Sequence, residues 1–425
     1  MTDLTTFSPS ELASLKSSLE ERYREFQSRQ LSLDMTRGKP CSEQLDLSLD
    51  MLNLVTADSY KTMEGVDCRN YGGIDGIPEA KALFSSVLGV ATEELLVCGN
   101  SSLNVMHDMV MRGLVHGFVD SELPWGKCDK ITFLCPVPGY DRHFSICEYL
   151  NIKMIAVPLN EDGPDMDLVE QYVSEDDSIK GIWCVPKYSN PTGTTYSDRV
   201  VDRLSQMKTK SADFKIFWDN AYAVHTLGES IDSLKNILDA CREAGNPERA
   251  FIFASTSKIT FAGAGLSLFA ASTKNIDFLR KRISFQMIGP DKLNQLRHVR
   301  FLKDKNNLEK LMQAHATILK PKFDTVLSVF DKELGDKNIA TWSRPKGGYF
   351  INLDVLEACA SKVVAKAAEA GVKLTPAGST FPYKNDPNDC NIRIAPSFPS
   401  SKEVALATEL LAVCIQLVSV EKLSK

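Results

Sequence analysis

The sequence lacks the features that mark several large classes of protein. Lys and Arg number 49 against 55 Asp and Glu, a net charge of −6, which argues against nucleic-acid binding because phosphate affinity needs clustered basic residues. No apolar run approaches the ~20 residues that a membrane-spanning helix needs. The N-terminus, MTDLTTFSPSEL, has neither the basic flank nor the apolar stretch of an export signal. We therefore expect a cytoplasmic protein that binds neither nucleic acid nor membrane.

Patterns typical of metal sites and disulfide frameworks are missing as well. The 11 cysteines include no Cys-x-x-Cys pair and have no regular spacing, so we expect reduced thiols. The six histidines show no His-Glu-x-x-His or similar spacing, and we expect no metal site. The chain has 425 residues, 43% hydrophobic and 24% charged, as is typical of a soluble globular protein with more than one domain.

Short apolar runs alternate with helix-length amphipathic segments through the middle of the chain. The strand candidates are KITFL, KMIAV, GIWCV, KIFW, AFIFA and LSLFAA. This alternation predicts an α/β fold whose largely parallel sheet is covered by helices on both faces. A capping box at Ser8 and Glu11, with Pro9 between them, predicts a helix to about residue 30. A long helical pattern over 306–334 is interrupted at Pro321, where we expect a kink.

Three segments are expected in the domain organisation. Residues 1–55 form an N-terminal helix and an irregular segment that belong to a small domain. Residues 56–310 form the large domain, which carries the sheet and the predicted site. Residues 311–425 form the rest of the small domain, in which GGYFINL, VKLTPAG and NIRIA alternate with helices as a smaller α/β unit.

Polar residues follow several of the predicted strands directly. In an open parallel sheet, ligands bind beyond the carboxyl ends of the strands, so these residues should lie at one edge. An amine, a carboxylate, an amide, a phenol and hydroxyls would meet there, as in a cofactor site. KITFL leads to CPVPGYDRH, and the residues that follow the other strands are Asn190, Asp219, Tyr222, Ser255, Ser257 and Lys258.

Lys258 stands in STSKITFAGAG among hydroxyls and small residues, with no nearby carboxylate to pair with it. A lysine amine in such a place can form a Schiff base with an aldehyde cofactor and can act as a general base and acid. The alternative is a lysine that extends from the strand end to solvent. A dinucleotide site at Gly263 to Gly265 is not supported, because no third glycine follows and the next segment is strand-like.

Over nearly its whole length the chain resembles the fold-type I, pyridoxal-phosphate-dependent aminotransferases of class I. The runs SKITFAGAG and GPDKLNQLRHVRF are most similar to the aspartate aminotransferase-like branch that shares its domain with MocR-type regulators. The resemblance implies a large domain with a seven-stranded type of sheet and a smaller α/β domain. It also implies pyridoxal 5'-phosphate (PLP) as cofactor and a homodimer with shared active sites. The implied reaction is a ping-pong transfer of an amino group, with aspartate as expected donor and 2-oxoglutarate as acceptor.

The resemblance assigns the cofactor ring to residues at the sheet edge. Lys258 would bind the aldehyde, and Asp219 would face the pyridine nitrogen and keep it protonated, supported by His143. Tyr140 would stack on the ring face. Asn190 and Tyr222 would hydrogen-bond the phenolate oxygen and lower the imine pKa. Taken singly, Asp219 could be a helix cap, NPTG a plain turn and His143 an ordinary buried histidine.

The phosphate of the cofactor is expected at VCGNSSLNVMHDMV, which reads as a strand end, a turn and a helix N-terminus. The family usually has an arginine eight residues after the lysine, where this chain has Leu266, so another cation or more neutral donors must replace it. The expected phosphate neighbours are Asn100, Ser101, Ser102, Ser255, Ser257 and, from the partner subunit, Tyr71. The candidates to replace the arginine, from the same or the partner subunit of the dimer, are Asn294, Arg297 and Arg300.

Substrate recognition is assigned to Arg393 in NIRIAPSF, which would bind the α-carboxylate as a bidentate fork. Gly38 in TRGKP would let the substrate approach closely. A dicarboxylate needs a second cation, for which Arg37, Lys39 and Arg142 are candidates. Arg142 is preferred because it lies close to Tyr140, and the alternative for it is a solvated surface arginine.

Other functions share most of these residues. An aminotransferase for aromatic substrates such as kynurenine, or a PLP-dependent β-eliminating lyase, would need the same Lys258, Asp219 and Arg393. A PLP-sensing regulator would carry a basic winged-helix segment before this domain, and here the domain begins almost at residue 1. We therefore expect an enzyme, and the residue that binds the second carboxylate is what would separate the enzymatic alternatives.

Overall fold

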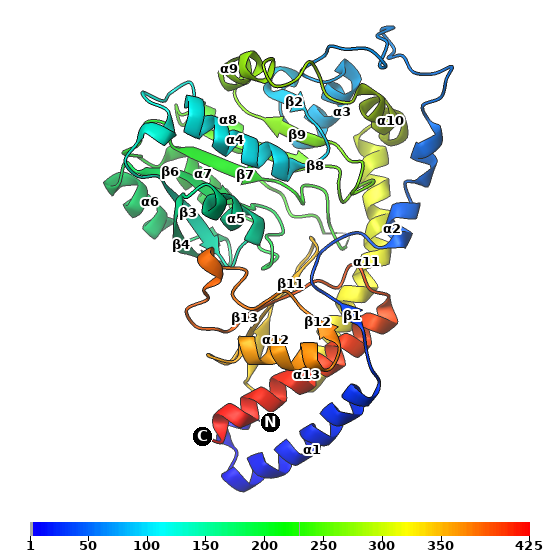
Figure 1. The fold of residues 1–425 in the computed structure, drawn as a ribbon, viewed down its shortest axis with the longest axis vertical. Coiled ribbons are helices and arrows are strands. Elements are labelled where there is room, and N and C mark those ends of the chain that lie inside the picture. The colour runs from blue at the N-terminus through cyan, green and yellow to red at the C-terminus, as the bar shows by residue number, and fades with distance from the viewer. Residues whose placement is uncertain (1–2, 229) are drawn as a thin grey trace.

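The computed structural model describes residues 3–228 and 230–425, and its centre is an eight-stranded sheet of order β2-β9-β8-β7-β6-β3-β4-β5 (Figure 1). The strands from β8 to β4 in this order are all parallel to their neighbours, which confirms the predicted α/β class. β9 is antiparallel to β8 and β2, and β5 is antiparallel to β4. The strands are β2 (Leu95–Val97), β3 (Thr132–Val137), β4 (Lys153–Asn160), β5 (Gly163–Pro164), β6 (Ile179–Cys184), β7 (Lys215–Asp219), β8 (Ala250–Ser255) and β9 (Ser267–Ala270).

Helices cover both faces of this sheet, which is why its central strands read as continuous apolar runs. Alternate residues of β7 enter opposite cores: Ile216 and Trp218 pack on one face, and Phe217 packs on the other. The first core is completed by α3 (Pro78–Leu88), α6 (Met166–Glu175), α7 (Asp198–Gln206), α8 (Ile237–Glu243) and α10 (Lys292–Leu302). The second is completed by α4 (Ser102–His116), α5 (Asp141–Tyr149) and α9 (Thr273–Ile283).

A further core is built from the two ends of the chain, below the sheet in Figure 1. Its antiparallel three-stranded sheet has the order β10-β11-β13, and a short parallel pair joins β1 to β12. The segment expected to be irregular also contains α2 and a 3-10 turn over Leu49–Asn53. The elements are α1 (Pro9–Ser28), β1 (Leu33–Asp34), α2 (Ser42–Asp46), α11 (Lys305–Leu334), β10 (Ala340–Trp342), β11 (Ile351–Val355), α12 (Ala360–Glu369), β12 (Val372–Lys373), β13 (Asn391–Ile394) and α13 (Ser401–Leu423).

Two helices test the sequence signals directly. The predicted capping box opens α1, because Ser8 accepts a hydrogen bond from the Glu11 backbone and Glu11 accepts one from the Ser8 backbone. Helix α11 continues through Pro321 without a break, so the proline does not end it, and the expected kink stays a prediction. Leu319 and Phe323, on either side of the proline, are buried in the core, and this packing outweighs the missing backbone hydrogen bond.

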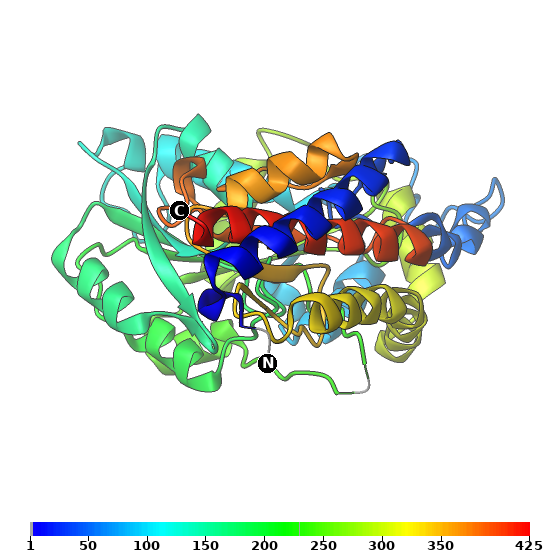
Figure 2. The same ribbon diagram turned by 90° about the horizontal axis from the view of Figure 1, so that it is seen from below.

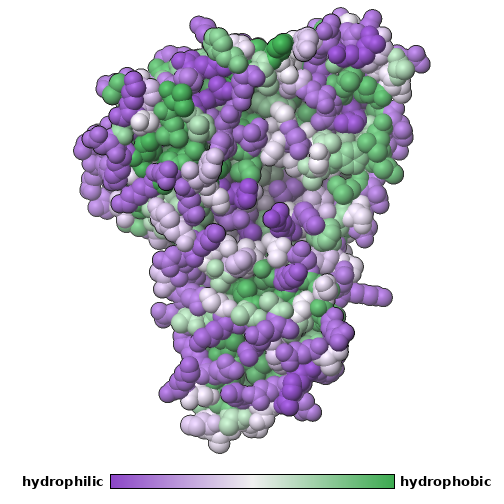
Figure 3. Space-filling view, viewed as in Figure 1, coloured by the Kyte–Doolittle hydropathy of each residue, from purple (hydrophilic) through white to green (hydrophobic). Residues whose placement is uncertain are grey.

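The C-terminal helix α13 corrects the sequence scan, which found no apolar run of membrane-spanning length. By length and composition α13 could cross a membrane, with a mean hydropathy of 1.8 over its most apolar window. However, 78% of that window is buried, because α1, α11 and α12 pack around it (Figure 2). It is therefore the central helix of the third core, and in Figure 3 polar side chains cover much of the narrow part that holds it.

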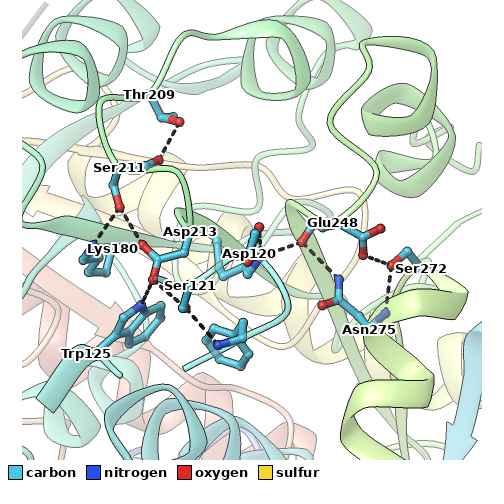
Figure 4. Close-up of polar contacts among 12 residues, drawn as sticks. Asp120, Ser121, Trp125, Lys180, Thr209, Ser211, Asp213, Glu248, Ser272 and Asn275 are labelled. Atoms are coloured by element: carbon cyan, nitrogen blue, oxygen red, sulfur yellow. Dashed lines mark hydrogen bonds and ion pairs between the residues drawn. The ribbon is translucent and has the colours of Figure 1, made fainter. Parts of the chain in front are cut away.

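A buried ionic network closes the amino ends of β6, β7 and β8 (Figure 4). Lys215, the first residue of β7, has a completely buried side chain, and its Nζ donates to both carboxylate oxygens of Asp120 at 2.7 and 2.6 Å. The same amine donates to the backbone oxygen of Glu248 at 2.8 Å. All three donors of this ammonium group are therefore used within the protein.

Asp213 is the second centre of this network. Its Oδ1 accepts hydrogen bonds from Lys180 and Ser211, both at 2.8 Å. Its Oδ2 accepts from Ser121 at 2.6 Å and from Trp125 Nε1 at 2.8 Å. Burial raises the pKa of the Asp213 carboxyl, but the bonds from Lys180, Ser121 and Ser211 outweigh it and hold this pKa below the ordinary value.

Candidate active site

A cavity of about 670 Å³ lies at the opposite edge of the sheet, where β3, β6, β7 and β8 end and the third core begins. The structure brings most of the predicted site residues to its wall, although they are spread over the whole chain. The predicted residues that line it are Arg37, Gly38, Lys39, Ser101, Ser102, Tyr140, Arg142, Asn190, Asp219, Tyr222, Ser255, Ser257, Lys258 and Arg393. Asn100, Tyr71, His143 and Asn294 lie outside this wall.

Lys258 follows β8 and is only partly exposed, at the base of the cavity. Its Nζ lies 5.1 Å from the centroid of the Tyr222 ring and 5.8 Å from that of the Tyr349 ring. Burial lowers the pKa of the amine, and the negative charge of Asp219 opposes this shift. A lowered pKa increases the fraction of neutral amine, which is the form that attacks a carbonyl.

Asp219 ends β7 and is 3% exposed. Its Oδ2 lies 3.0 Å from Nε2 of His143, and the His143 ring stacks on Trp183 with centroids 4.4 Å apart. The other oxygen, Oδ1, is buried and has no hydrogen-bond partner among the described residues. A buried carboxylate oxygen without a donor is costly, so this position calls for a ligand that donates a hydrogen bond.

The phenols of the site are held protonated. Burial raises the pKa of Tyr222 well above its ordinary value, and the nearby Tyr140 and Asp219 act in the same direction. Burial also raises the pKa of Tyr140, again assisted by Asp219. Both hydroxyls therefore remain hydrogen-bond donors near neutral pH.

The N-terminus of α4 forms one end of the cavity. Ser101 is the N-cap residue but makes no capping hydrogen bond, which leaves backbone N–H groups of the first turn without a side-chain partner. Ser102, Ser255 and Ser257 line the same region. Free N–H groups, the helix dipole and hydroxyls suit a phosphate group. Asn100 does not line the cavity, because its Oδ1 accepts a hydrogen bond from the Gly265 backbone at 2.7 Å.

The candidates to replace the family arginine do not face the cavity of their own chain. Arg300 donates to the backbone oxygens of Leu54, Ser59 and Lys61, so it fixes that segment instead. Asn294 donates to the oxygens of Ala264 and Gly265 and accepts from Arg297, which supports the loop after Lys258. Leu266 itself is 1% exposed and packed in the core. A contact from these residues across a subunit interface remains a prediction.

Arg393, on β13, lies across the cavity with 6% exposure. Its Nη1 donates to Asp141 Oδ1 at 2.7 Å and to Asn190 Oδ1 at 3.4 Å, and its Nη2 donates to Thr375 Oγ1 at 3.2 Å. The guanidinium carbon is 4.9 Å from the centroid of the Phe350 ring. The guanidinium group is thus already fixed in position before any ligand binds.

Gly38 has a packing role that the sequence did not predict. A Cβ at this position would lie 2.5 Å from Phe350 Cζ, so the ring against Arg393 requires glycine here. Arg37, Lys39 and Arg142 are all exposed side chains at the cavity wall. Lys39 Nζ lies 3.7 Å from the centroid of the Phe398 ring. The three candidate cations therefore share one cavity with Arg393.

Several residues near Lys258 were missed by the sequence reasoning. Gln44 Nε2 donates to Tyr349 Oη at 2.8 Å and to His315 Nδ1 at 2.9 Å, and His315 Nε2 lies 3.0 Å from the oxygen of Ile259. This chain of hydrogen bonds connects the backbone beside Lys258 to the ring that covers its amine. GGYFINL was recognised only as a strand, and no local signal marks Gln44 or His315.

His225 was missed too. It is 3% exposed, and neither ring nitrogen has a hydrogen-bond partner among the described residues. Burial lowers the pKa of this imidazole well below its ordinary value, and the neighbouring Lys258 lowers it further. His225 is therefore neutral at physiological pH and adds no positive charge beside the lysine amine.

The fold and the cavity together define the aminotransferase class of enzymes. A sequence profile described as aspartate amino-transferase matches residues 7–425, and the chain belongs to that family.

Known proteins agree with this assignment. An aspartate aminotransferase of Corynebacterium glutamicum is 45% identical over 403 residues, 95% of this chain and 93% of the relative. The crystal structure of an aspartate transaminase from the same species superimposes with a TM-score of 0.97 at 44% identity, covering 99% of each chain. An α-aminoadipate aminotransferase of Thermus thermophilus, complexed with N-(5'-phosphopyridoxyl)-L-leucine, has a TM-score of 0.73 at 20% identity. It covers 93% of this chain and 95% of its own, and shows a shared fold.

Proposed function

We propose that the protein transfers the amino group of aspartate to 2-oxoglutarate with PLP as cofactor, as a cytoplasmic homodimer. The observation that carries the cofactor assignment is the buried Asp219 Oδ1, which lacks a donor and lines the cavity at the end of β7. The protonated nitrogen of a pyridine ring is such a donor. The substrate assignment is supported by the relatives, two of which are named for aspartate.

The residues at the cavity wall fit each part of this cofactor. When bound, PLP supplies an aldehyde that takes up the amino group and a ring that accepts electrons from the substrate α-carbon. Asp219 would accept the hydrogen bond of the ring nitrogen, and Tyr222, with its protonated phenol, would donate to the ring oxygen. Asn190 would contact the same oxygen through its amide nitrogen, since its Oδ1 faces Arg393. The phosphate would lie among Ser101, Ser102, Ser255 and Ser257.

Lys258 would move the proton of the reaction. Its amine lies in the cavity beside Tyr222, and its lowered pKa leaves part of the population unprotonated. In that form Nζ can take the proton from the substrate α-carbon and then deliver it to the reacting carbon of the cofactor. His225 is neutral next to it and therefore does not repel the protonated intermediate state of the lysine.

Substrate binding would use two cations at opposite ends of the substrate. Arg393 would hold the α-carboxylate, because its guanidinium group faces the cavity and is fixed by Thr375 and Asn190. Arg142 is proposed for the second carboxylate. It is exposed at the cavity wall next to Asp141, and no ion pair is recorded for it within residues 3–228 and 230–425.

The proposal of a homodimer is supported by an exposed apolar surface. Two segments, around residues 63–72 and 285–289, lie together, because a Cβ on Gly289 would be 2.6 Å from the oxygen of Gly72. They expose large apolar side chains, as protein interfaces do. These are Met63 at 94%, Val66 at 42%, Tyr71 at 82%, Phe285 at 92% and Ile288 at 57%. Burial of this surface by a second copy would place Tyr71 in the partner subunit's site.

The domain division is proposed on the basis of the separate cores. Residues 56–310 would form the large domain around the eight-stranded sheet, and residues 1–55 and 311–425 the small one around α13. The cavity between them would close on the substrate and exclude water.

An absorbance spectrum of the purified protein tests the proposal. We expect a yellow absorption band that disappears when aspartate is added and returns with 2-oxoglutarate. A band that aspartate leaves unchanged would contradict the substrate and favour an aromatic donor or β-elimination. No band after incubation with PLP would contradict the cofactor site itself.

A further inference from the structure

The arginine assigned to the substrate α-carboxylate already contacts a carboxylate of its own chain. Asp141 Oδ1 lies 2.7 Å from Arg393 Nη1, and the arginine is 6% exposed. This is a short, charge-assisted hydrogen bond in a mostly buried setting, where such bonds are strong. Asp141 also lines the cavity, so the pair lies within the site and not behind it.

The other two nitrogen atoms of the Arg393 guanidinium group are Nε and Nη2. Nε is buried and has no hydrogen-bond partner among the described residues. Nη2 donates one hydrogen to Thr375 Oγ1. A carboxylate bound end-on uses Nη1 and Nη2 together, and Nη1 is the atom that donates to Asp141.

Asp141 is placed so that it can leave. It is the first residue of α5, and its side chain is 31% exposed, against 6% for its partner. The N-cap residue of α5, Tyr140, makes no side-chain capping hydrogen bond, and the N–H of His143 donates to the Tyr140 backbone oxygen at 3.1 Å, so the N-terminus of α5 has no capping side chain and its dipole favours a nearby carboxylate. The exposed Arg142 is its neighbour. The released carboxylate would thus keep favourable electrostatic contacts.

We propose that Asp141 is a resident competitor for Arg393, which holds the guanidinium group in position without substrate and is displaced by the substrate α-carboxylate. This inference rests on the proposed function, because it takes Arg393 as the substrate arginine. The exchange replaces one carboxylate by another, so each binding event loses an ion pair as it gains one. Asp141 therefore weakens the binding of amino and oxo acids and assists the release of the product.

The test is the affinity of the PLP-loaded protein for maleate, a dicarboxylate that carries no amino group to transfer, measured by calorimetry. Asp141→Asn should bind maleate about 10-fold more tightly than the wild type, as expected when a charged competitor becomes a neutral one. Asp108→Asn is the matched control. Asp108 is 30% exposed and pairs at 3.1 Å with the 9% exposed Arg112, and neither residue lines the cavity. This variant should bind maleate as the wild type does.

Two outcomes would overturn the inference. Unchanged or weaker maleate binding by Asp141→Asn would show that Asp141 positions Arg393 without competing. A gain in affinity that survives the additional change Arg393→Ala would place maleate elsewhere. A crystal structure of the wild-type complex adds an independent reading, in which Asp141 should lie outside hydrogen-bonding distance of Nη1.

Turnover of aspartate in the same wild-type preparation separates this inference from the proposed reaction. If the wild type transaminates normally and Asp141→Asn leaves the maleate affinity unchanged, the role of Asp141 is wrong and the proposed reaction stands. A gain in maleate affinity that depends on Arg393, in a protein without transamination, would support the role of Asp141 and sink only the proposed reaction.

Discussion

The two edges of the central sheet are built from the same strands but satisfy their polar groups in opposite ways. At the amino ends of β6 and β7, the charged groups of Lys180, Asp213 and Lys215 are all paired, and Figure 4 shows the contact between Lys180 and Asp213. At the carboxyl ends, Asp219 lines the cavity, and its buried Oδ1 has no partner among the residues that the structure describes. Since folded proteins pair almost all buried polar atoms, the unpaired edge indicates where a ligand completes the structure.

The contrast is sharpest between two lysines. Burial lowers the pKa of Lys215, although Asp120 opposes the shift, and burial lowers that of Lys258, although Asp219 opposes it. Lys215 makes direct hydrogen bonds to both oxygens of Asp120, whereas Lys258 lies over aromatic rings. The first amine is immobilised by its partners, while the second retains a reactive nitrogen.

The largest expected effect is that of Lys258→Ala on turnover. Loss of the amine removes both the attachment of the cofactor and the proton transfer, so transamination should fall by about 10⁴-fold or more. In the cofactor-free proteins the unfolding temperature should not fall, because no residue that the structure describes forms an ion pair with Lys258. Activity assays and thermal unfolding of the same preparation check both parts. Substantial remaining transamination would contradict the assignment of the lysine.

A change in the ionic network at the amino ends of the strands should lower stability and leave turnover intact. Asp213→Ala removes the counter-charge of Lys180 and the acceptor of Trp125 Nε1, so we expect the free energy of unfolding to fall by about 3–5 kcal/mol. Turnover per folded molecule should be unchanged, because the network lies at the far edge from the cavity. Urea unfolding and assays below the transition measure the two quantities. A loss of activity without a loss of stability would contradict the purely structural role of the Asp213 network.

The contribution of Asp213 should also depend on pH. Its pKa is lower in the folded protein than the ordinary value of 3.8, so its ionised form stabilises the fold. This stabilisation is fully present above the pKa of the unfolded chain and is lost as the pH falls through the folded value. The stability difference between wild type and Asp213→Asn should thus be constant from pH 5 to 7 and shrink below about pH 4. A difference that grows on acidification would contradict this direction.

The sequence predicted the cavity wall better than its surroundings, for a physical reason. Asp219 ends β7, and Lys258 and Asn190 lie in the segments after β8 and β6, and the carboxyl ends of parallel strands meet at one edge. Asp141 and Gln44 were missed because their partners, Arg393 and Tyr349, lie far away in the sequence, and no local pattern records such a contact. The contacts of Arg300 with the oxygens of Leu54, Ser59 and Lys61 were not predicted for the same reason, since a basic residue in a matching motif says nothing about which backbone oxygens it meets.

Helix α13 shows the converse problem. Its composition is that of a membrane segment, and only the packing of α1, α11 and α12 around it explains that composition. A helix surrounded by protein loses the polar face that marks an amphipathic surface helix. Local sequence therefore identifies strand ends well, but not the partners of a side chain or the environment of a fully buried helix.

In the cavity at the carboxyl ends of the strands, Arg142→Ala should affect dicarboxylate substrates only. If Arg142 binds the second carboxylate, kcat/KM for aspartate should fall about 10- to 100-fold, as expected for a lost charge-assisted hydrogen bond, while neutral amino acids are little affected. Lys39→Ala is the matched control, because Lys39 lines the same cavity but lies over Phe398. Equal losses for charged and neutral donors would move the specificity role to Lys39 or Arg37.

The smallest effect is expected for the hydrogen-bonded group of Gln44, Tyr349 and His315 near Lys258. Gln44→Leu leaves Tyr349 Oη and His315 Nδ1 without their donor, which should cost about 1–2 kcal/mol of unfolding free energy. Because the Tyr349 ring covers the amine of Lys258, turnover should fall severalfold as well.

Gln416→Leu is the control for this change. Gln416 is also buried, but within the part of the chain that the structure describes its Nε2 donates to the Ala412 oxygen of α13 alone, at 3.3 Å. The apolar side chain should therefore be tolerated there at little cost and without any effect on turnover. If Gln44→Leu lowers stability and leaves turnover unchanged, the network supports the fold alone. If Gln44→Leu lowers both stability and turnover, and Gln416→Leu lowers neither, then the reactivity of Lys258 depends on the hydrogen bonds of Gln44.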